Sequence, residues 1–416
     1  MLYVYYEERV VGYLRLEETI LSFTYAKSWL ESTDSFPISP HLPLAPISYT
    51  ENAVVFFFSN LLPEGNILST ILKLKRLREG DLYAQLKILG EEVAGAFSII
   101  SSPDKPPQKA HYQEYSAAEI EQDLSLISKH IPLLSQHQKL RLSLAGAQNK
   151  IPVKFEAEKF WLPVNGAAST HILKPAIQPQ ELFMDSVWNE ALCLRLATYC
   201  GLNTVSFEVK LFSSEPVLLI ERYDRIHQEE KIQRLHQLDF CQLTKRLPDQ
   251  KYEKDGGISF SVIFDAIDQY TTKPALNKLK VLDWMLFNYL IGNADAHAKN
   301  LSILISPSNQ VELTPFYDIL CTAVYEKLDK KMAMAIGGEY RPEWVLQKNW
   351  DEFADALSIN ISLLRDRADK LIKKLSDNYS LATQNLELTD NSPIVKKIAA
   401  VIERRTRLLK SRLINF

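Results

Sequence analysis

The hydrophobic pattern of the first hundred residues predicts short strands. Residues 2–16 alternate apolar and polar side chains and reverse around Glu7-Glu8, which is typical of a β-hairpin. Residues 93–100 form another strand-like run. Residues 101–107 are rich in Ser and Pro, and this composition can neither pack nor continue a sheet. We therefore expect a linker there.

The middle of the chain predicts two buried strands with a helix between them. Residues 170–174 and 216–220 are mostly apolar and are bounded by Pro or polar residues, as buried strands are. Residues 187–199 place apolar side chains at helical spacing: Val187, Ala191, Leu194 and Ala197. The pattern beyond residue 140 is thus rich in strands until about residue 225.

Beyond residue 230 the pattern becomes helical. One stripe consists of Leu279, Leu282, Leu286 and Leu290. Pro274 suits the first turn of this helix and Gly292 suits its end. Ser392 and Pro393 are an N-cap and first-turn pair for a final helix that we expect to reach about Leu413. A β-rich part followed by a helical part predicts an α+β fold.

Composition and charge exclude several classes of protein. The chain has 416 residues, 46% of them hydrophobic and 24% charged, which is ordinary for two or three packed globular units. A formal net charge of -3 disfavours a globally basic nucleic-acid binder. The four cysteines lack C-x-x-C spacing, which fits a reducing compartment. We find no signal peptide and no apolar run long enough for a membrane span, so we expect a cytoplasmic protein.

The strongest chemical signal is the segment from Asn293 to Asn300. Asp295 precedes Asn300 by five positions, a predicted hairpin covers residues 301–314, and Asp318 follows. This is the layout of a phosphotransferase centre that uses ATP and Mg²⁺. Asp295 would be the base, Asn300 and Asp318 the metal ligands, and Lys299 would neutralise the γ-phosphate. His297 could instead belong to a metal site, but no second His lies at metal spacing.

Three upstream segments could complete an ATP site. Residues 144–150 offer small side chains and Lys150 for a phosphate cradle, although they contain one glycine and a plain turn is the more frequent explanation. Lys174 ends an apolar strand and could pair with Glu190 on the next helix. Taken singly, each of the two is more simply explained as a solvent-exposed surface residue. Residues 221–223 (Glu221, Arg222 and Tyr223) stand where a hinge would offer backbone groups to adenine.

These motifs together resemble the HipA family of bacterial serine/threonine kinase toxins. The resemblance rests on residues 143–150, 170–174, 189–190, 221–225, 255–257, 295–300 and 313–318, and on residues 60–64 and 93–96 nearer the N-terminus. It spans nearly the whole chain. It implies a two-lobed, protein-kinase-like α+β fold with an extra N-terminal subdomain. We expect the boundaries at residues 1–102, 103–225 and 226–416.

The resemblance also implies a function and partners. It implies a toxin that phosphorylates Ser or Thr of a host protein, a tRNA synthetase in the best-known member. A small helix-turn-helix antitoxin of the HipB type would neutralise it, and the pair would bind operator DNA and repress its own operon. It assigns ATP and Mg²⁺ binding to Ala145, Gly146, Ala147, Gln148, Asn149, Lys150, Lys174, Glu221, Arg222, Tyr223, His297, Lys299, Asn300, Tyr317 and Asp318.

Ser143 corresponds to the autophosphorylated serine of that family. A phosphate there would add about -1.5 to -2 charge beside the cradle and would repel ATP. Read from the sequence alone, Ser143 is a hydroxyl without a role. Asn149 replaces the acidic residue that is typical of the family at this position, which puts little in doubt.

Two alternative functions stay open at this point. A small-molecule phosphotransferase of the antibiotic-kinase type uses a similar loop, and a catalytically silent co-repressor would need no intact Asp295. The final helix carries a basic series: Lys396, Lys397, Arg404, Arg405, Arg407, Lys410 and Arg412. A solvated helix face explains this series more simply than contact with DNA phosphates does.

Overall fold

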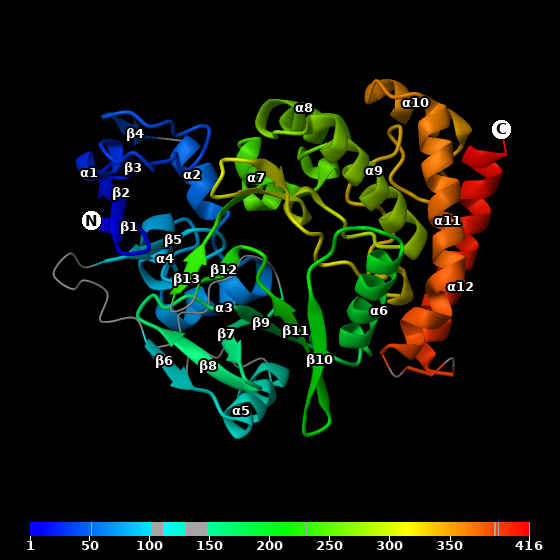
Figure 1. Ribbon diagram of the computed structural model, residues 1–416, viewed down its shortest axis with the longest axis horizontal. Coiled ribbons are helices and arrows are strands. Elements are labelled where there is room, and N and C mark those ends of the chain that lie inside the picture. Colours follow the sequence, from blue (N-terminus) through cyan, green and yellow to red (C-terminus); the bar gives the residue numbers. More distant parts are fainter. Residues whose placement is uncertain are drawn as a thin grey trace. The chain divides into compact units, whose positions relative to one another are not determined.

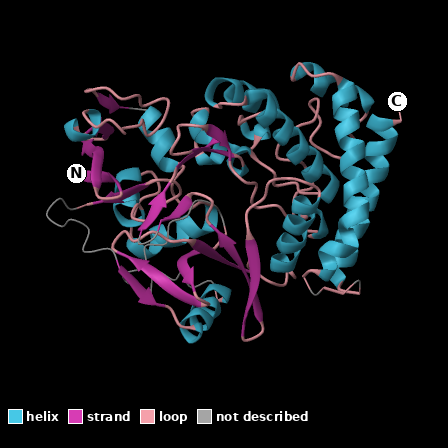
Figure 2. Ribbon diagram, in the orientation of Figure 1, coloured by secondary structure: helices cyan, strands magenta, loops and turns pink. Residues whose placement is uncertain are grey.

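The chain folds into two compact units. The computed structural model describes residues 1–50, 52–101, 111–129, 148–228, 231–386, 388–389 and 391–415. Unit 1 comprises Met1–Gln178, Lys210–Pro248 and Leu304–Asn309, and unit 2 comprises Pro179–Val209, Asp249–Ile303 and Gln310–Phe416. Strands predominate in unit 1 and helices in unit 2 (Figure 1, Figure 2). Most of the predicted linker, residues 102–107, lies outside the described residues.

The first sheet of unit 1 begins with the predicted hairpin. Its five strands have the order β4 (Ser48–Thr50), β3 (Ile20–Tyr25), β2 (Arg9–Glu17), β1 (Leu2–Tyr6) and β5 (Phe97–Ile100). Helix α1 (Lys27–Leu30) contacts β2, α2 (Asn52–Ser59) contacts β3 and β4, and α4 (Leu82–Leu89) contacts β5, whereas α3 (Gly65–Lys75) follows α2 in the chain. In β2, a Cβ at Gly12 would lie 2.5 Å from the carbonyl oxygen of Thr24, so the close approach of β3 requires glycine.

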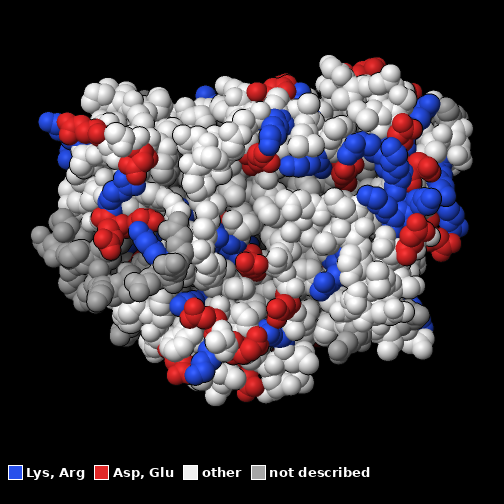
Figure 3. Space-filling view, in the orientation of Figure 1, with Lys and Arg blue, Asp and Glu red and all other residues white. Residues whose placement is uncertain are grey.

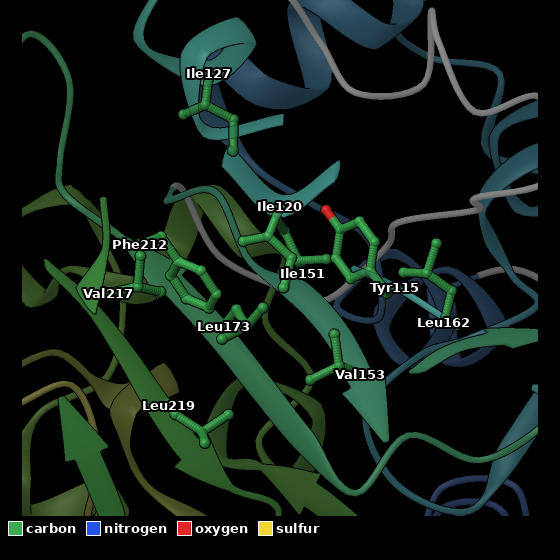
Figure 4. Close-up of a cluster of buried hydrophobic side chains, with 10 residues drawn as sticks. All are labelled: Tyr115, Ile120, Ile127, Ile151, Val153, Leu162, Leu173, Phe212, Val217 and Leu219. Atoms are coloured by element: carbon green, nitrogen blue, oxygen red, sulfur yellow. The ribbon is translucent and has the colours of Figure 1, made fainter. Parts of the chain in front are cut away.

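The second sheet of unit 1 carries the core of the predicted nucleotide region. Its order is β10 (Phe207–Phe212), β11 (Glu215–Glu221), β9 (His171–Pro175), β7 (Ile151–Glu156), β8 (Lys159–Val164) and β6 (His111–Glu114). Helix α5 (Ala117–Ser128) begins with a capping box between Ser116 and Glu119. Its Ile120 and Ile127 pack with Leu173 of β9 in one hydrophobic cluster (Figure 4). Because successive side chains alternate across a strand, Lys174 faces the opposite side of the sheet from this cluster.

Unit 2 consists mainly of helices. They are α6 (Ser186–Tyr199), α8 (Phe260–Tyr270), α9 (Pro274–Ile291), α10 (Gln347–Ala356), α11 (Ile361–Gln384) and α12 (Pro393–Leu409). Helices α8, α11 and α12 all contact α9, whose C-terminal half is buried almost continuously. Pro274 occupies the first turn and Gly292 caps the end in the left-handed conformation, as predicted. Strands β15 (Ser302–Ile305) and β16 (Val311–Leu313) confirm the predicted hairpin.

Two predictions about element boundaries were wrong. Residues 93–96 are not strand, because Gly95 has φ +82° and its N–H donates to the Asp224 carboxylate instead of a sheet partner. The chain is not yet helical at residue 230. It continues as β12 (Arg225–Gln228), β13 (Lys231–Arg234), β14 (His236–Asp239) and the short helix α7 (Phe240–Leu243). Polar side chains that are buried in this stretch, such as Arg234, hid the strand pattern.

The last helix also differs from its prediction in detail. Helix α12 starts at Pro393, as expected, but ends at Leu409 and continues as one π-helical segment, Lys410–Ile414. The side chain of Ser392 accepts no hydrogen bond from the first turn. Its hydroxyl lies 3.2 Å from that of Thr389 instead, so the local turn takes the place of the cap.

Candidate active site

The segment that contains Asp295 begins where α9 ends. Gly292 has φ +74°, and its N–H bonds back to the last turn of the helix. A Cβ at this position would lie 2.6 Å from Cγ1 of Val401 and 2.8 Å from Cβ of Ala323. Glycine is therefore needed both for the left-handed turn and for the close approach of two other segments of unit 2. The turn directs the chain out of the helix and into the Asp295 loop.

Two asparagine side chains hold the backbone of Asp295. The Oδ1 atom of Asn293 accepts a hydrogen bond from the N–H of Asp295 at 3.1 Å. The Nδ2 atom of Asn300 donates to the carbonyl oxygen of Asp295 at 3.2 Å. Asn293 is itself held by Asn288 of α9, at 2.8 Å. The five-residue spacing of Asp295 and Asn300 thus closes a tight loop through their own hydrogen bond.

The segment around Asp318 is tied to the same loop. The hydroxyl of Tyr317 donates to the carbonyl oxygen of Lys299 at 2.9 Å and lies 2.9 Å from the hydroxyl of Ser302. Asp318 has φ +58°, a left-handed conformation that aspartate tolerates better than most residues. Unit 2 therefore brings together six of the predicted residues: Asp295, His297, Lys299, Asn300, Tyr317 and Asp318.

A threonine that we did not single out from the sequence closes the base of this site. The Oγ1 atom of Thr322 accepts from the N–H of Ala294 at 2.7 Å and donates to the carbonyl oxygen of Gly292 at 3.2 Å. Thr322 is nearly fully buried. No local pattern marks this residue, because its two partners lie about thirty positions earlier in the chain.

Helix α6 presents Glu190 from a fixed position in unit 2. Asn189, its neighbour, donates through Nδ2 to the carbonyl oxygen of Cys321 at 3.0 Å and accepts from the N–H of Cys321 at 2.8 Å. The Glu190 side chain is buried, with 2% exposed. A buried carboxylate needs a cationic or hydrogen-bonding partner. The burial of Glu190 agrees with a carboxylate that has a partner. It does not agree with the alternative explanation, a solvent-exposed glutamate on a helix.

The donor set near Asn300 suits Mg²⁺. The amide nitrogen of Asn300 is used by the Asp295 carbonyl, which leaves Oδ1 as a ligand oxygen. Mg²⁺ prefers oxygen ligands and in kinases takes several of them from the phosphates. Among the described residues, no three His, Cys, Asp or Glu side chains form a cluster that could hold a metal ion. The metal ligands predicted from the sequence are Asn300 and Asp318.

Unit 1 carries the other predicted nucleotide residues. Lys174 is 3% exposed and pairs with Leu218 across the β9–β11 ladder. Gln148 donates through Nε2 to the carbonyl oxygen of Pro175 at 2.9 Å, which holds the end of the predicted cradle beside the end of β9. Asn149 and Lys150 are half-buried. Ser143, Ala145, Gly146 and Ala147 lie outside the described residues.

The predicted hinge contains an arginine whose side chain serves the fold. Glu221 is exposed at the end of β11, and the hydroxyl of Tyr223 donates to Oε1 of Gln237. Arg222, in contrast, donates to Glu92 at 2.9 Å and to both carboxylate oxygens of Asp224 at 2.8–2.9 Å. Its guanidinium is thus fully engaged inside unit 1. The backbone N–H of Arg222 donates to the carbonyl oxygen of Thr170 at 2.9 Å, so a nucleotide contact by Arg222 is left to its carbonyl oxygen.

Arg222 belongs to a buried ionic cluster that consists of Glu92, Arg222, Asp224, Arg225 and Arg234. Burial alone would raise the pKa of Glu92, but Arg234, Arg222 and Arg225 hold the pKa of this carboxyl below its usual value. The pKa of Asp224 is likewise lowered, by Arg222 and Arg225 against the effect of burial. Burial, together with repulsion by Arg222, lowers the pKa of Arg225 to about 10. The cluster joins residues near the first sheet to the hinge.

Family models match two parts of the chain. One described as "HipA-like C-terminal domain" matches residues 142–381, and one described as "HipA N-terminal domain" matches residues 2–100. The first alone covers more than half of the chain. The chain belongs to the HipA family. The resemblance that the motifs predicted is thereby confirmed.

Relatives of known name agree with this assignment to the HipA family. "Putative kinase Y4mE" of Sinorhizobium fredii is 31% identical, over 99% of this chain and 98% of the relative. "Serine/threonine-protein kinase toxin HipA" of Shewanella oneidensis is 30% identical, over 88% of this chain and 85% of the relative. The family thus includes proteins named as kinases and as a toxin.

A solved HipA structure confirms the fold. It is described as "Shewanella oneidensis MR-1 Toxin Antitoxin System HipA, HipB and its operator DNA complex". The match has a TM-score of 0.84 at 27% identity and covers 99% of this chain and 97% of the other. The predicted kinase-like α+β fold is therefore correct. HipB and operator DNA are the partners in that complex.

The basic series on the last helix divides by exposure. Lys396, Lys397, Arg404, Arg407 and Lys410 are exposed, whereas Arg405 is 2% exposed. Arg412 donates to the carbonyl oxygens of Glu343 and Val345. In the view of Figure 3, Lys and Arg gather over the C-terminal helices, with Asp and Glu among them. Within the described residues, no helix is both long enough and apolar enough to cross a membrane.

Proposed function

We propose that this protein is the toxin of a toxin–antitoxin pair and transfers the γ-phosphoryl group of ATP to a Ser or Thr hydroxyl of a host protein. One observation carries this proposal: the hydrogen bonds that hold Asp295 between Asn293 and Asn300, with Tyr317 and Asp318 tied to the same loop. A silent co-repressor would have no use for this arrangement. The HipA kinase relatives support the same conclusion.

The proposed transfer needs one proton acceptor and several cations. The acceptor hydroxyl attacks the γ-phosphorus, its proton passes to the Asp295 carboxylate, and ADP leaves. Lys299 neutralises charge on the γ-phosphate. Asn300 and Asp318 would hold Mg²⁺, which would supply positive charge against the charge that develops on the phosphates. His297, buried beside Asp295, would line the same site.

The residues of unit 1 would serve the rest of the nucleotide. Lys150 and the backbone of residues 145–150 would bind phosphates, and Lys174 would hold the α- and β-phosphates. Glu221 and Tyr223 would flank the adenine. Autophosphorylation of Ser143 would then add negative charge beside the cradle and oppose ATP binding.

The proposed partners follow the complex that the relative forms. We propose that a HipB-like helix-turn-helix antitoxin binds this protein and that the pair binds operator DNA and represses its operon. The exposed basic residues of α12 would contact DNA phosphates only within that pair. The host substrate would be a cytoplasmic protein, with an aminoacyl-tRNA synthetase as the first to test.

The deciding experiment is incubation with Mg·ATP followed by intact-mass analysis and peptide mapping. Asp295→Asn removes the base at nearly constant shape, and Asp265→Asn, on the exposed side of α8, is the matched control. We expect labelled Ser143 and labelled protein in a lysate with the wild type and with the control. No label on any protein would sink the kinase proposal. Label on a small molecule alone would favour the antibiotic-kinase type.

A further inference from the structure

A tyrosine outside the predicted site contacts the predicted base. The hydroxyl of Tyr252 donates to Oδ1 of Asp295 at 2.7 Å. Tyr252 lies forty-three positions before Asp295, and both residues belong to unit 2. Among the described residues, this is the single hydrogen bond to the Asp295 carboxylate. The phenol therefore engages one oxygen of the base and leaves Oδ2 available.

Hydrogen bonds fix the backbone around Tyr252. The next residue, Glu253, donates its N–H to the carbonyl oxygen of Ala333 at 3.0 Å, and its carboxylate accepts from the N–H of Ala335 at 2.7 Å. The carbonyl oxygen of Tyr252 accepts from the N–H of Gly257 at 3.1 Å. A Cβ at Gly257 would lie only 2.1 Å from the carbonyl oxygen of Gln250. Residues 250–257 thus form a tight loop that requires this glycine.

The ring of Tyr252 is also held. It packs edge-on against the imidazole of His297, with ring centroids 5.4 Å apart. The ammonium groups of Lys251 and Lys254 lie 5.3 Å and 5.8 Å from its centroid, within the range of cation–π attraction. Lys254 is anchored in turn by Asp329 at 3.1 Å. A side chain with these contacts has little freedom to swing away.

We propose that Tyr252 is a positioning residue for the phosphoryl transfer. Its phenol fixes Oδ1 of Asp295 so that Oδ2 faces the acceptor hydroxyl and takes its proton. This inference rests on the proposed kinase function and adds a residue to it. Tyr252 itself exchanges no proton with the substrate.

Orientation of the base is the chemical reason for such a residue. A carboxylate on a short side chain rotates about its last bond, and a misdirected oxygen cannot accept the proton as the hydroxyl attacks. Holding one oxygen removes this freedom before the substrate arrives, which lowers the entropic cost of reaching the transition state. The rigid mounting of residues 250–257 argues against the opposite role, in which the phenol blocks the acceptor position until it is displaced.

The test compares two tyrosine variants that each lose one phenol hydrogen bond of equal length. Tyr252→Phe removes the bond to Asp295, and Tyr379→Phe removes the 2.7 Å bond to the carbonyl oxygen of Val395 between α11 and α12. Phosphorylation of the protein itself and of myelin basic protein is measured at saturating Mg·ATP, together with the KM for ATP. Thermal melting and binding of a non-hydrolysable ATP analogue report the folded state.

We expect Tyr252→Phe to lower kcat by about 10- to 100-fold with an unchanged KM for ATP and unchanged analogue binding. Tyr379→Phe should keep the wild-type kcat. In the Asp295→Asn background, Tyr252→Phe should cost nothing further, because the phenol acts through that carboxylate. Equal kcat for the two single variants would overturn the positioning role, and so would a higher kcat for Tyr252→Phe. If the wild type transfers no phosphate, the kinase proposal itself fails instead.

Discussion

The amide nitrogen of Asn300 donates to the carbonyl oxygen of Asp295 at 3.2 Å, so the proposed metal ligand also holds the backbone of the proposed base. The Asn300 side chain would thereby both hold the Asp295 backbone and bind Mg²⁺. The sequence shows only the five-residue spacing of the two residues. The Asn300 nitrogen serves the loop and its oxygen is left for Mg²⁺. This division of labour requires an amide, because a carboxylate has no N–H to donate.

Asn300→Asp should therefore damage the loop even though it offers oxygen ligands. The new carboxylate would face the Asp295 carbonyl oxygen without a proton between them. We expect phosphoryl transfer to fall by about 100-fold or more, with a loss of stability of about 1–3 kcal/mol. Kinase assays and urea denaturation measure the two effects.

The matched control for this change is Asn360→Asp. Asn360 caps α11 through its side-chain oxygen, which accepts from the N–H of Ser362 at 2.8 Å. Aspartate caps a helix as well as asparagine does, so activity and stability should stay near wild type. Full activity of Asn300→Asp would contradict the role of the amide nitrogen.

Gly292 should be sensitive to a single methyl group. Gly292→Ala places a Cβ 2.6 Å from Val401 at φ +74°, whereas Gly338→Ala has the same φ and open space around it. The control therefore reports the cost of the left-handed backbone alone, about 1 kcal/mol. We expect Gly292→Ala to cost about 1–3 kcal/mol more, since packed atoms must move. Similar unfolding midpoints for the two variants would argue against the clash.

The buried ionic cluster should be far more important for stability than exposed ion pairs are. Glu92→Gln leaves the three arginines of the cluster with one carboxylate fewer, and we expect a loss of about 3–5 kcal/mol in the free energy of unfolding. Glu158→Gln breaks an exposed pair with Lys210 and should cost less than about 1 kcal/mol. Denaturant titrations monitored by circular dichroism distinguish the two. Equal losses would mean that the cluster is structurally dispensable.

His236 predicts a pH dependence of stability. Burial lowers the pKa of this imidazole to about 4, and its Nε2 lies 3.0 Å from the carbonyl oxygen of Ile38. The pKa of His236 in the folded protein lies below its unfolded value of about 6.5. The contribution of the neutral imidazole to the free energy of unfolding is therefore full above pH 6.5 and is lost as the pH falls towards 4. The loss should approach about 3 kcal/mol.

Unfolding measured between pH 7 and pH 4 tests this dependence on His236. His236→Gln should flatten the slope in that window, and His227→Gln, at an exposed position, should leave the slope unchanged. If the His236→Gln slope equals that of the wild type, another group causes the loss. Glu92 and Asp224, whose pKa values are lowered, add to it only at still lower pH.

Local patterns in the sequence were sufficient to predict many of the helices and strands and the loop that contains Asp295. The leucine stripe, Pro274 and Gly292 predicted α9 and its end, because a helix and its caps depend on neighbouring residues. The spacing of Asp295 and Asn300 predicted one tight loop with Asp318 beyond a hairpin, and the hydrogen bonds of Asn300 and Tyr317 bring these segments together. The family followed from the order of the motifs.

Tertiary structure alone decided what the buried polar groups do. Arg222 looked like part of a nucleotide hinge, yet its guanidinium turns inward to Glu92, which lies 130 positions away. Tyr252 had no pattern that pointed to Asp295, and Thr322 had none that pointed to Gly292. Such contacts depend on which segments meet after folding, and no periodicity records them. The sequence by itself determined many of the elements, the loop spacing and the family, and folding determined which side chains support the base.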